Sequence, residues 1–135
     1  MEKLSNPRKT VEILKKYDFA FRKRFGQNFL IDGRVLDKII AGAGVCREDL
    51  ALEIGPGIGT LTQYLAEAAG KVVSIEIDKK LLPILDETLA EYDNTRVINA
   101  DVMDLDLRQL ISEEMETAGI EGRKPEHVKV VANLP

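Results

Sequence analysis

The stretch that most constrains this chain runs from Leu50 to Thr60 and reads LALEIGPGIGT. Its first half is apolar apart from one acid, which is typical of a buried strand in a parallel sheet. Three glycines then alternate with other residues, and this spacing allows a tight turn that a ligand can approach closely. Apolar residues at helical spacing follow, with Thr60, Thr62 and Gln63 between them. A strand, a glycine loop and a helix in this order predict a ligand site over the carboxyl end of the strand.

The spacing of Gly55, Gly57 and Gly59 separates this loop from two other nucleotide-binding loops. A nicotinamide or flavin fingerprint needs a glycine at the sixth place, and that place is a threonine whether counted from Gly55 or from Gly57. A phosphate-cradling loop needs Gly-Lys followed by Ser or Thr, and no Lys follows these glycines. The pattern acid-x-Gly-x-Gly-x-Gly from Glu53 to Gly59 instead resembles the S-adenosylmethionine loop of doubly wound methyltransferases. The alternative is a glycine-rich turn with no ligand, although three glycines carry an entropic cost that a plain turn does not need.

Length and composition indicate one small soluble domain. The chain has 135 residues, of which 44% are hydrophobic and 31% are charged, as in globular proteins. No apolar run approaches the roughly 20 residues of a membrane span, and the N-terminus lacks a secretory pattern. The single Cys46 cannot form an internal disulfide, which suits a reducing compartment, so we expect a cytoplasmic location. The spacing of His, Cys and acidic residues gives no support for a metal site, and none is expected.

The net charge of −4 conceals an asymmetry along the chain. Residues 1–30 hold eight Lys or Arg and three acids, a net charge of +5, which leaves −9 for the remainder. A basic segment on an acidic body is typical of contact with a polyanion, the alternative being a solvated charged face. Within this segment Arg22, Lys23 and Arg24 are consecutive, and their side chains are free to reach phosphate. The side-chain amides of Gln27 and Asn28 offer donors and acceptors for a zwitterionic ligand such as the methionine end of the cofactor.

The rest of the chain alternates helices with strands, which predicts a doubly wound, Rossmann-like α/β fold. Helices are expected over residues 7–17, 32–43, 79–92 and 105–118, and strands over residues 50–54, 71–78, 96–100 and 128–132. Asp32 would cap the second of these helices, and its apolar residues share one face, namely Val35, Leu36, Ile39, Ile40 and Ala43.

Acidic residues end the second and third strands. Glu76 lies about twenty residues beyond Gly55, where an acid meets ribose hydroxyls in nucleoside-binding sheets, and its two oxygens can accept both vicinal hydroxyls. Asp101 could accept a hydrogen bond from the exocyclic amine of an adenine, while the backbone N–H of Val102 could serve a ring nitrogen. For each acid the alternative is an ordinary carboxylate at the end of a strand.

Five segments together match a known family in order and spacing. They are FGQNFL at 25–30, EIGPGIG at 53–59, the strand end Glu76-Ile77-Asp78, Asp101, and Asn133-Leu134-Pro135. With them the chain resembles the N-terminal part of the ribosomal small-subunit rRNA dimethyladenosine transferases, over nearly all residues from Phe21 onward. The large-subunit adenine methyltransferases of macrolide resistance share the plan, but the first two segments are closer to the small-subunit enzymes.

The resemblance implies an S-adenosylmethionine-dependent enzyme of ribosome biogenesis. It would place two methyl groups on N6 of each of two adjacent adenosines near the 3′ end of small-subunit rRNA. Residues from the arm, the glycine loop and the strand ends would hold the cofactor, namely Gln27, Asn28, Leu30, Glu53, Gly55, Gly57, Gly59, Glu76, Ile77, Asp101, Val102 and Asn133. Catalysis would fall to Asn133, Leu134 and Pro135, with Asn133 Oδ1 and the Leu134 carbonyl accepting the two N6–H bonds of the target adenine.

The resemblance also implies a layout. Residues 1–31 would form a basic N-terminal helix and arm, and residues 32–135 the N-terminal part of a methyltransferase domain truncated after its fourth strand. A C-terminal RNA-binding helical domain and a stacking aromatic after Pro135 are missing, so the fragment itself is expected to be inactive. The expected partner is small-subunit rRNA or the precursor of that subunit, with no membrane and no metal. One alternative is a large-subunit rRNA adenine methyltransferase of the macrolide-resistance type. Another is a non-catalytic RNA-binding or ribosome-assembly module, against which the acids Glu76 and Asp101 argue. A third is a small-molecule methyltransferase, against which the basic arm and the Asn-Leu-Pro ending argue.

Overall fold

The computed structural model describes residues 2–18 and 32–132, and within them four strands form one parallel sheet in the order β3-β2-β1-β4. The strands are β1 Asp49–Ile54, β2 Lys71–Glu76, β3 Thr95–Asn99 and β4 His127–Ala132. Leu52 in the middle of β1 lies beside Val73 of β2 and Val130 of β4. Because all the strands run the same way, the carboxyl ends of β1, β2 and β3 meet at one edge of the sheet.

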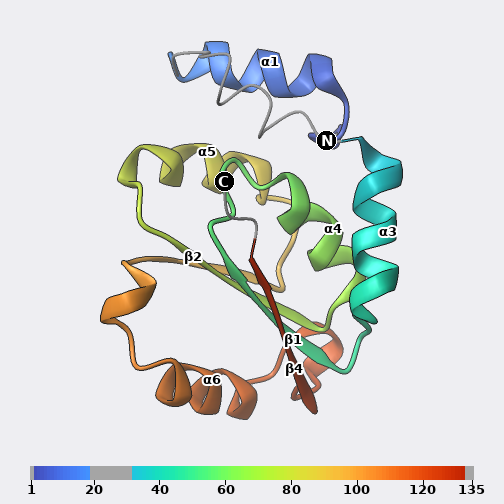
Figure 1. Ribbon diagram of the computed structural model, residues 1–135, viewed down its shortest axis with the longest axis vertical. Helices are drawn as coiled ribbons and strands as arrows, with labels where there is room; N and C mark the ends of the chain where they lie inside the picture. The colour runs from blue at the N-terminus through green and yellow to red at the C-terminus, as the bar shows by residue number, and fades with distance from the viewer. Residues whose placement is uncertain (1, 19–31, 133–135) are drawn as a thin grey trace.

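Helices cover both faces of the sheet, so the doubly wound α/β fold expected from the sequence is confirmed (Figure 1). The α-helices are α1 Pro7–Lys16, α3 Gly33–Ala43, α4 Thr60–Ala68, α5 Leu82–Thr88 and α6 Leu107–Glu116. The described residues also form short 3-10 turns, namely η1 Lys79–Leu81 before α5, η2 Val102–Asp104 before α6 and η3 Ile120–Gly122 between α6 and β4. Among the described residues, no helix is both long enough and apolar enough to cross a membrane.

The core lies on the two faces of the central strands β1 and β2, which are buried almost throughout. On one face Ala51 and Val72 pack against Leu61 and Leu65 of α4 and Leu36 of α3. On the other face the buried residues face α6, and they are Leu50, Leu52, Val73 and Ile75. Fully buried strands explain the nearly continuous apolar run in β1, because a parallel strand is covered on both sides.

The first helix packs onto the glycine loop and α5. Ile13 and Leu14 of α1 are buried in one cluster with Ile58 of the loop and with Ile84 and Leu85 of α5. The predicted cap of this helix is confirmed, since Asn6 Oδ1 accepts a 3.0 Å hydrogen bond from the backbone N–H of Arg8. Residues near the start of the chain therefore contribute to the core that supports the glycine loop.

Only part of the apolar face predicted for α3 is buried. Leu36 is fully buried, but Val35 and Ile39 are 49% and 38% exposed. Among the described residues, Leu36 packs against α4 and the sheet, with Ile40 partly buried beside it, so a narrower stripe than the apolar pattern reaches the core. Its two ends are as predicted, with Asp32 capping the start and Gly44 ending the helix in a left-handed conformation.

The single helix expected over residues 79–92 is divided in the structure. A 3-10 turn, η1, precedes α5, and α5 ends at Thr88. Pro83 has no N–H to donate to the preceding turn, which favours a break at this point. Beyond Thr88 the chain turns, and Asn94 Nδ2 donates a 2.9 Å hydrogen bond to the carbonyl of Ala66 near the end of α4.

Candidate functional site

The glycine loop joins β1 to α4 at the carboxyl edge of the sheet. Gly55, Gly57 and Gly59 have φ values of 75°, 61° and 98°, a region that side-chain-bearing residues rarely adopt. At Gly59 space is also limited, because a Cβ atom there would lie 2.9 Å from Thr88 Oγ1. Backbone hydrogen bonds of 3.0 Å run from Gly55 N to Ile75 O and from Gly59 N to Pro56 O. The alternate glycines are therefore needed for the conformation of the loop.

Glu53 lies fully buried at the base of this loop. Its Oε1 accepts hydrogen bonds from Thr62 Oγ1 of α4 at 2.5 Å and from Ser74 Oγ of β2 at 2.9 Å. Its Oε2 has no hydrogen-bond partner among the described residues. Burial raises the pKa of Glu53 to about 7, with a further contribution from the charge of Glu76, and the two hydroxyl donors oppose this rise. Glu53 thus links β1 to α4 and β2 beneath the glycine loop. A contact between Glu53 and the cofactor stays a prediction.

Two further residues that sequence reasoning did not single out fasten the loop. Thr88 Oγ1 donates a 2.8 Å hydrogen bond to the carbonyl of Ile58, and Gln63 Nε2 donates at 2.9 Å to the carbonyl of Thr88. Gln63 Oε1 also accepts a 2.9 Å hydrogen bond from the backbone N–H of Leu4. These links join the N-terminal segment, α4, α5 and the loop. In the sequence, the one indication that this part of α4 is buried was that its polar residues Thr60, Thr62 and Gln63 carry no charge.

Glu76 ends β2, beside the glycine loop. Its Oε1 accepts a hydrogen bond of 3.1 Å from the backbone N–H of Gly57, and its Oε2 accepts one of 2.9 Å from the backbone N–H of Asp78. The residue is 5% exposed. The Asn99 side chain on β3 donates to the Glu76 carbonyl at 2.8 Å, which fixes the end of β2 against its neighbour. The predicted ribose acid therefore lies within hydrogen-bond reach of the glycine loop.

Asp101 follows β3 and caps η2, where its Oδ1 accepts a 2.9 Å hydrogen bond from the backbone N–H of Met103. Val102 is the first residue of that turn and is partly buried. Two large apolar side chains at this edge are strongly exposed, Ile77 at 65% and Met103 at 86%. Acids with unused acceptor capacity beside exposed apolar side chains suit a nucleoside, whose hydroxyls and amine donate and whose base is flat and apolar on its faces.

The sheet thus gathers one part of the predicted site, namely Glu53, Gly55, Gly57, Gly59, Glu76, Ile77, Asp101 and Val102. The order β3-β2-β1 makes the three strand ends consecutive along the edge. The other predicted residues lie outside the described part of the chain, and they are Arg22, Lys23, Arg24, Gln27, Asn28, Leu30, Asn133, Leu134 and Pro135. Their roles in binding and catalysis stay predictions.

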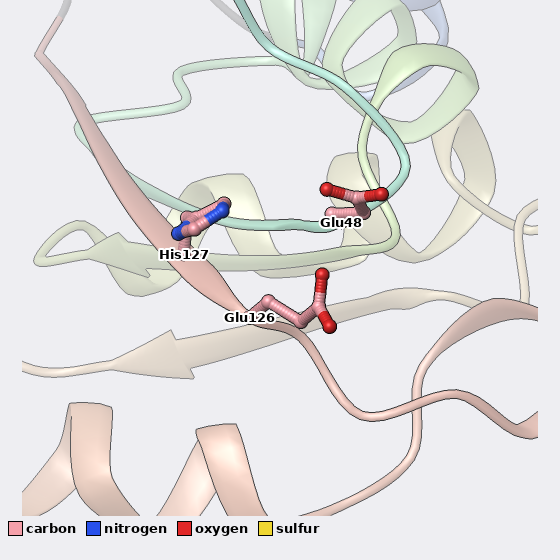
Figure 2. A group of neighbouring side chains, drawn as sticks. All are labelled: Glu48, Glu126 and His127. Atoms are coloured by element: carbon pink, nitrogen blue, oxygen red, sulfur yellow. The ribbon is translucent and has the colours of Figure 1, made fainter.

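A separate group of potential metal ligands lies at the opposite end of β1. Glu48, Glu126 and His127 are all exposed, and one ligand atom from each lies within 4.8 Å of the others (Figure 2). The backbone N–H groups of Glu126 and His127 both donate to the carbonyl of Glu48, at 2.7 and 3.2 Å. Sequence spacing did not indicate this group, because Glu48 is far from the other two along the chain. It lies at the amino end of β1 and takes no part in the nucleoside site.

Comparison with known proteins agrees with this geometry. A family profile described as Ribosomal RNA adenine dimethylase matches residues 18–135. The Ribosomal RNA small subunit methyltransferase A of Lachnoclostridium phytofermentans is 53% identical over 136 residues, which cover all of this chain and 44% of that protein. The chain therefore spans less than half the length of the curated relatives that it matches.

Solved structures of methyltransferases share the fold. A dimethyladenosine transferase from Plasmodium falciparum is 34% identical with a TM-score of 0.51, over 55% of this chain and 28% of that one. The 23S rRNA methyltransferase ErmE is 27% identical with a TM-score of 0.54, over 76% and 46% of the two chains. An RNA methyltransferase from Salinibacter ruber, solved with S-adenosyl-L-homocysteine, is 25% identical with a TM-score of 0.52, over 57% and 53%. Taken with the profile match and the glycine loop, these likenesses establish that the chain belongs to the ribosomal RNA adenine dimethylase family.

Proposed function

We propose that this chain is the N-terminal part of an enzyme that methylates small-subunit rRNA in the cytoplasm, using S-adenosylmethionine. The finer proposal is that two methyl groups go to N6 of each of two adjacent adenosines near the 3′ end of that RNA. The observation that carries the proposal is the meeting of the glycine loop, Glu76 and Asp101 at the carboxyl edge of three adjacent strands. A nucleoside cofactor placed there meets acceptors for its hydroxyls and for its amine.

Each part of the cofactor has a group of this chain that suits it. The Glu76 carboxylate accepts hydrogen bonds from the ribose hydroxyls, and Asp101 accepts one from the adenine amine, with the Val102 N–H donating to a ring nitrogen. Ile77 supplies an exposed apolar surface for the base. The loop glycines leave room for the main chain to approach the ligand. Gln27, Asn28 and Leu30 would hold the methionine end.

A bound S-adenosylmethionine would supply a methyl group on a sulfonium. The N–CH3 bond would form as the S–CH3 bond breaks, with S-adenosylhomocysteine as the leaving group, and the methylated nitrogen would release one proton to solvent. The adenine amine is a poor nucleophile, because its lone pair is delocalised into the ring. Asn133 Oδ1 and the Leu134 carbonyl would accept its two N–H bonds and favour a pyramidal nitrogen, and Pro135 would complete this motif. Positioning of the amine then supplies much of the acceleration. Arg22, Lys23 and Arg24 would hold RNA phosphates.

The test is methyl transfer by the complete protein that contains this chain. Under-methylated small ribosomal subunits are incubated with labelled S-adenosylmethionine, and the RNA is digested to nucleosides for mass spectrometry. We expect N6,N6-dimethyladenosine from small-subunit RNA and none from purified large subunits. The 135-residue chain is assayed in parallel, and we expect no product from it. Label confined to another nucleoside, or no transfer by the complete protein, would overturn the proposal.

The likeness to ErmE favours a second candidate, methylation of large-subunit rRNA. The same assay separates the two, because product would then appear in large-subunit RNA alone. A non-catalytic RNA-binding module would instead bind small subunits and form no methylated nucleoside at any enzyme concentration. These three outcomes exclude one another.

A further inference from the structure

One carboxylate joins the two backbone segments that border the nucleoside site. Glu76 Oε1 accepts from Gly57 N–H of the glycine loop at 3.1 Å, and Glu76 Oε2 accepts from Asp78 N–H after β2 at 2.9 Å. These are bonds within the protein alone. We propose that Glu76 is a positioning residue that holds the glycine loop before the cofactor binds, in addition to the ribose contact proposed above.

The loop has a specific need for this contact. Within the turn from Pro56 to Gly59, the Gly59 N–H donates to the Pro56 carbonyl at 3.0 Å. Just before this turn, the Gly55 N–H donates to the Ile75 carbonyl of β2, also at 3.0 Å. The N–H of Gly57 lies between these two bonds and is directed to a side chain instead. Because glycine loses the most backbone freedom on folding, three glycines in five residues make this segment costly to order. A hydrogen bond to an ionised carboxylate is stronger than a neutral one and can hold it.

The other side of the loop is already fastened by uncharged contacts. Ile58 is buried among residues of α1 and α5, and its carbonyl accepts from Thr88 Oγ1 at 2.8 Å. Glu76 supplies the matching attachment on the side of β2. The loop is thus held from two directions before any ligand arrives, which reduces the ordering cost of binding. Carboxylate oxygens have about four lone-pair sites in total, so two N–H contacts leave capacity for hydroxyl donors.

The experiment measures amide hydrogen exchange of the 135-residue chain by NMR with no cofactor present. In Glu76→Ala both acceptors are lost, and we expect exchange at Gly57 and Asp78 to be faster by about tenfold or more. Gly55 N–H should keep its protection, because its acceptor is the Ile75 carbonyl. Protection of amides within β1 and β2 reports whether the variant is folded.

Glu76→Gln keeps the inference testable if the alanine variant does not fold. A glutamine retains one oxygen acceptor and places an NH2 group opposite the other N–H, so protection should fall at one of Gly57 and Asp78 and persist at the other. The matched control is Asp106→Asn, because Asp106 makes the same kind of contact elsewhere, accepting from Gln109 N–H at 3.1 Å. That control should leave Gly57 exchange unchanged.

Unchanged exchange at Gly57 and Asp78 in folded Glu76→Ala or Glu76→Gln would overturn the inference. Equal acceleration of Gly57 exchange in Asp106→Asn would overturn it as well, because the effect would then be general loosening. Since no cofactor or RNA is present, either result is independent of the methyl-transfer assay, and failure of the proposed function would leave this result standing.

Discussion

The hydroxyl of Thr88 on α5 donates a 2.8 Å hydrogen bond to the carbonyl of Ile58 in the glycine loop. Both residues are 1% exposed, so water cannot replace this bond in the folded chain. The loop is therefore joined to a helix that lies thirty positions further along the sequence. A buried carbonyl that loses its donor costs free energy, because the unfolded chain can bond that carbonyl to water.

We predict that Thr88→Val lowers the free energy of unfolding by about 1–3 kcal/mol, because valine preserves the shape and leaves the Ile58 carbonyl unsatisfied. Urea denaturation of the 135-residue chain measures the effect. The matched control is Thr95→Val, because the Thr95 hydroxyl makes only a 3.4 Å contact to the Tyr92 carbonyl in a partly buried position. Equal destabilisation by the two substitutions would show that the Thr88 bond is not special.

We predict that stability depends on pH through Glu53. Burial raises the pKa of its carboxyl from 4.5 to about 7, so the folded chain favours the protonated form. As pH rises from 4.5 to 7 the unfolded state loses this proton first, and the free energy of unfolding falls until the folded carboxyl has also ionised. Glu53→Gln cannot ionise, so the stability of the wild type relative to this variant should fall by roughly 3 kcal/mol across that window.

Denaturant titrations at a series of pH values from 4.5 to 8 measure this difference. An exposed acid provides the control, and Glu121→Gln should leave the pH profile of the wild type unchanged. Parallel profiles for the wild type and Glu53→Gln would contradict the prediction, because they would mean that Glu53 has the same affinity for protons in both states.

The strand ends of the candidate site could be predicted from sequence, but the contacts that hold the loop could not. Glu76 and Asp101 end apolar runs of strand length, and parallel strands bring such ends together at one edge. Gln63 gave no such signal, since a polar residue between apolar positions usually faces water, yet it is 1% exposed. Its partners are backbone atoms of Leu4 and Thr88, which are distant in sequence. Periodicity describes the neighbours of a residue along its own helix only.

Sequence periodicity also could not predict how wide the buried face of a helix is or where a helix ends. Val35 and Ile39 follow the helical spacing of Leu36 but remain exposed, because the width of a buried stripe is set by what packs against it. The pattern of apolar residues also does not indicate that α5 ends at Thr88. Leu89 continues the apolar pattern and is buried, although it lies beyond the helix. Tertiary contacts decided both cases.

We predict that Glu114 on α6 is needed for stability because it neutralises Lys71 in β2. The two side chains form an ion pair in which Lys71 is 11% and Glu114 is 4% exposed, and Arg96 also pairs with Glu114. Glu114→Gln leaves the buried ammonium without its counter-charge, which should cost about 3 kcal/mol in the free energy of unfolding. Glu116→Gln on the same helix is the control, since its exposed pair with Lys124 should contribute less than about 1 kcal/mol. Similar losses for the two variants would contradict the prediction.

We predict that Arg22, Lys23 and Arg24 bind RNA phosphate, which rests on the proposed function. Replacing all three with Ala in the complete protein should weaken binding to a small-subunit rRNA fragment and flatten its salt dependence, because fewer counterions are released. Filter binding between about 50 and 200 mM salt gives the slope. The control replaces Arg8, Lys15 and Lys16 of α1 with Ala, which removes the same charge. Identical salt slopes for the wild type and for the variant that lacks Arg22, Lys23 and Arg24 would mean that these three cations face solvent and do not contact RNA phosphate.

The last prediction concerns how Asp101 recognises the base. Asp101 Oδ1 accepts from the Met103 N–H, so Oδ2 is the oxygen that can accept from an adenine amine. In Asp101→Asn the cap can persist while the second position becomes an NH2 donor, which opposes an amine and complements a carbonyl. Calorimetric titration of the complete protein compares S-adenosylhomocysteine with its inosine analogue, which has a carbonyl in place of the amine. The wild type should prefer the adenosine compound by about tenfold or more, and Asp101→Asn should reduce or reverse that preference. Asp104→Asn, which alters an exposed acid in the same turn, should keep the preference of the wild type. If Asp101→Asn weakens both ligands by the same factor, Asp101 supports the turn and does not read the amine.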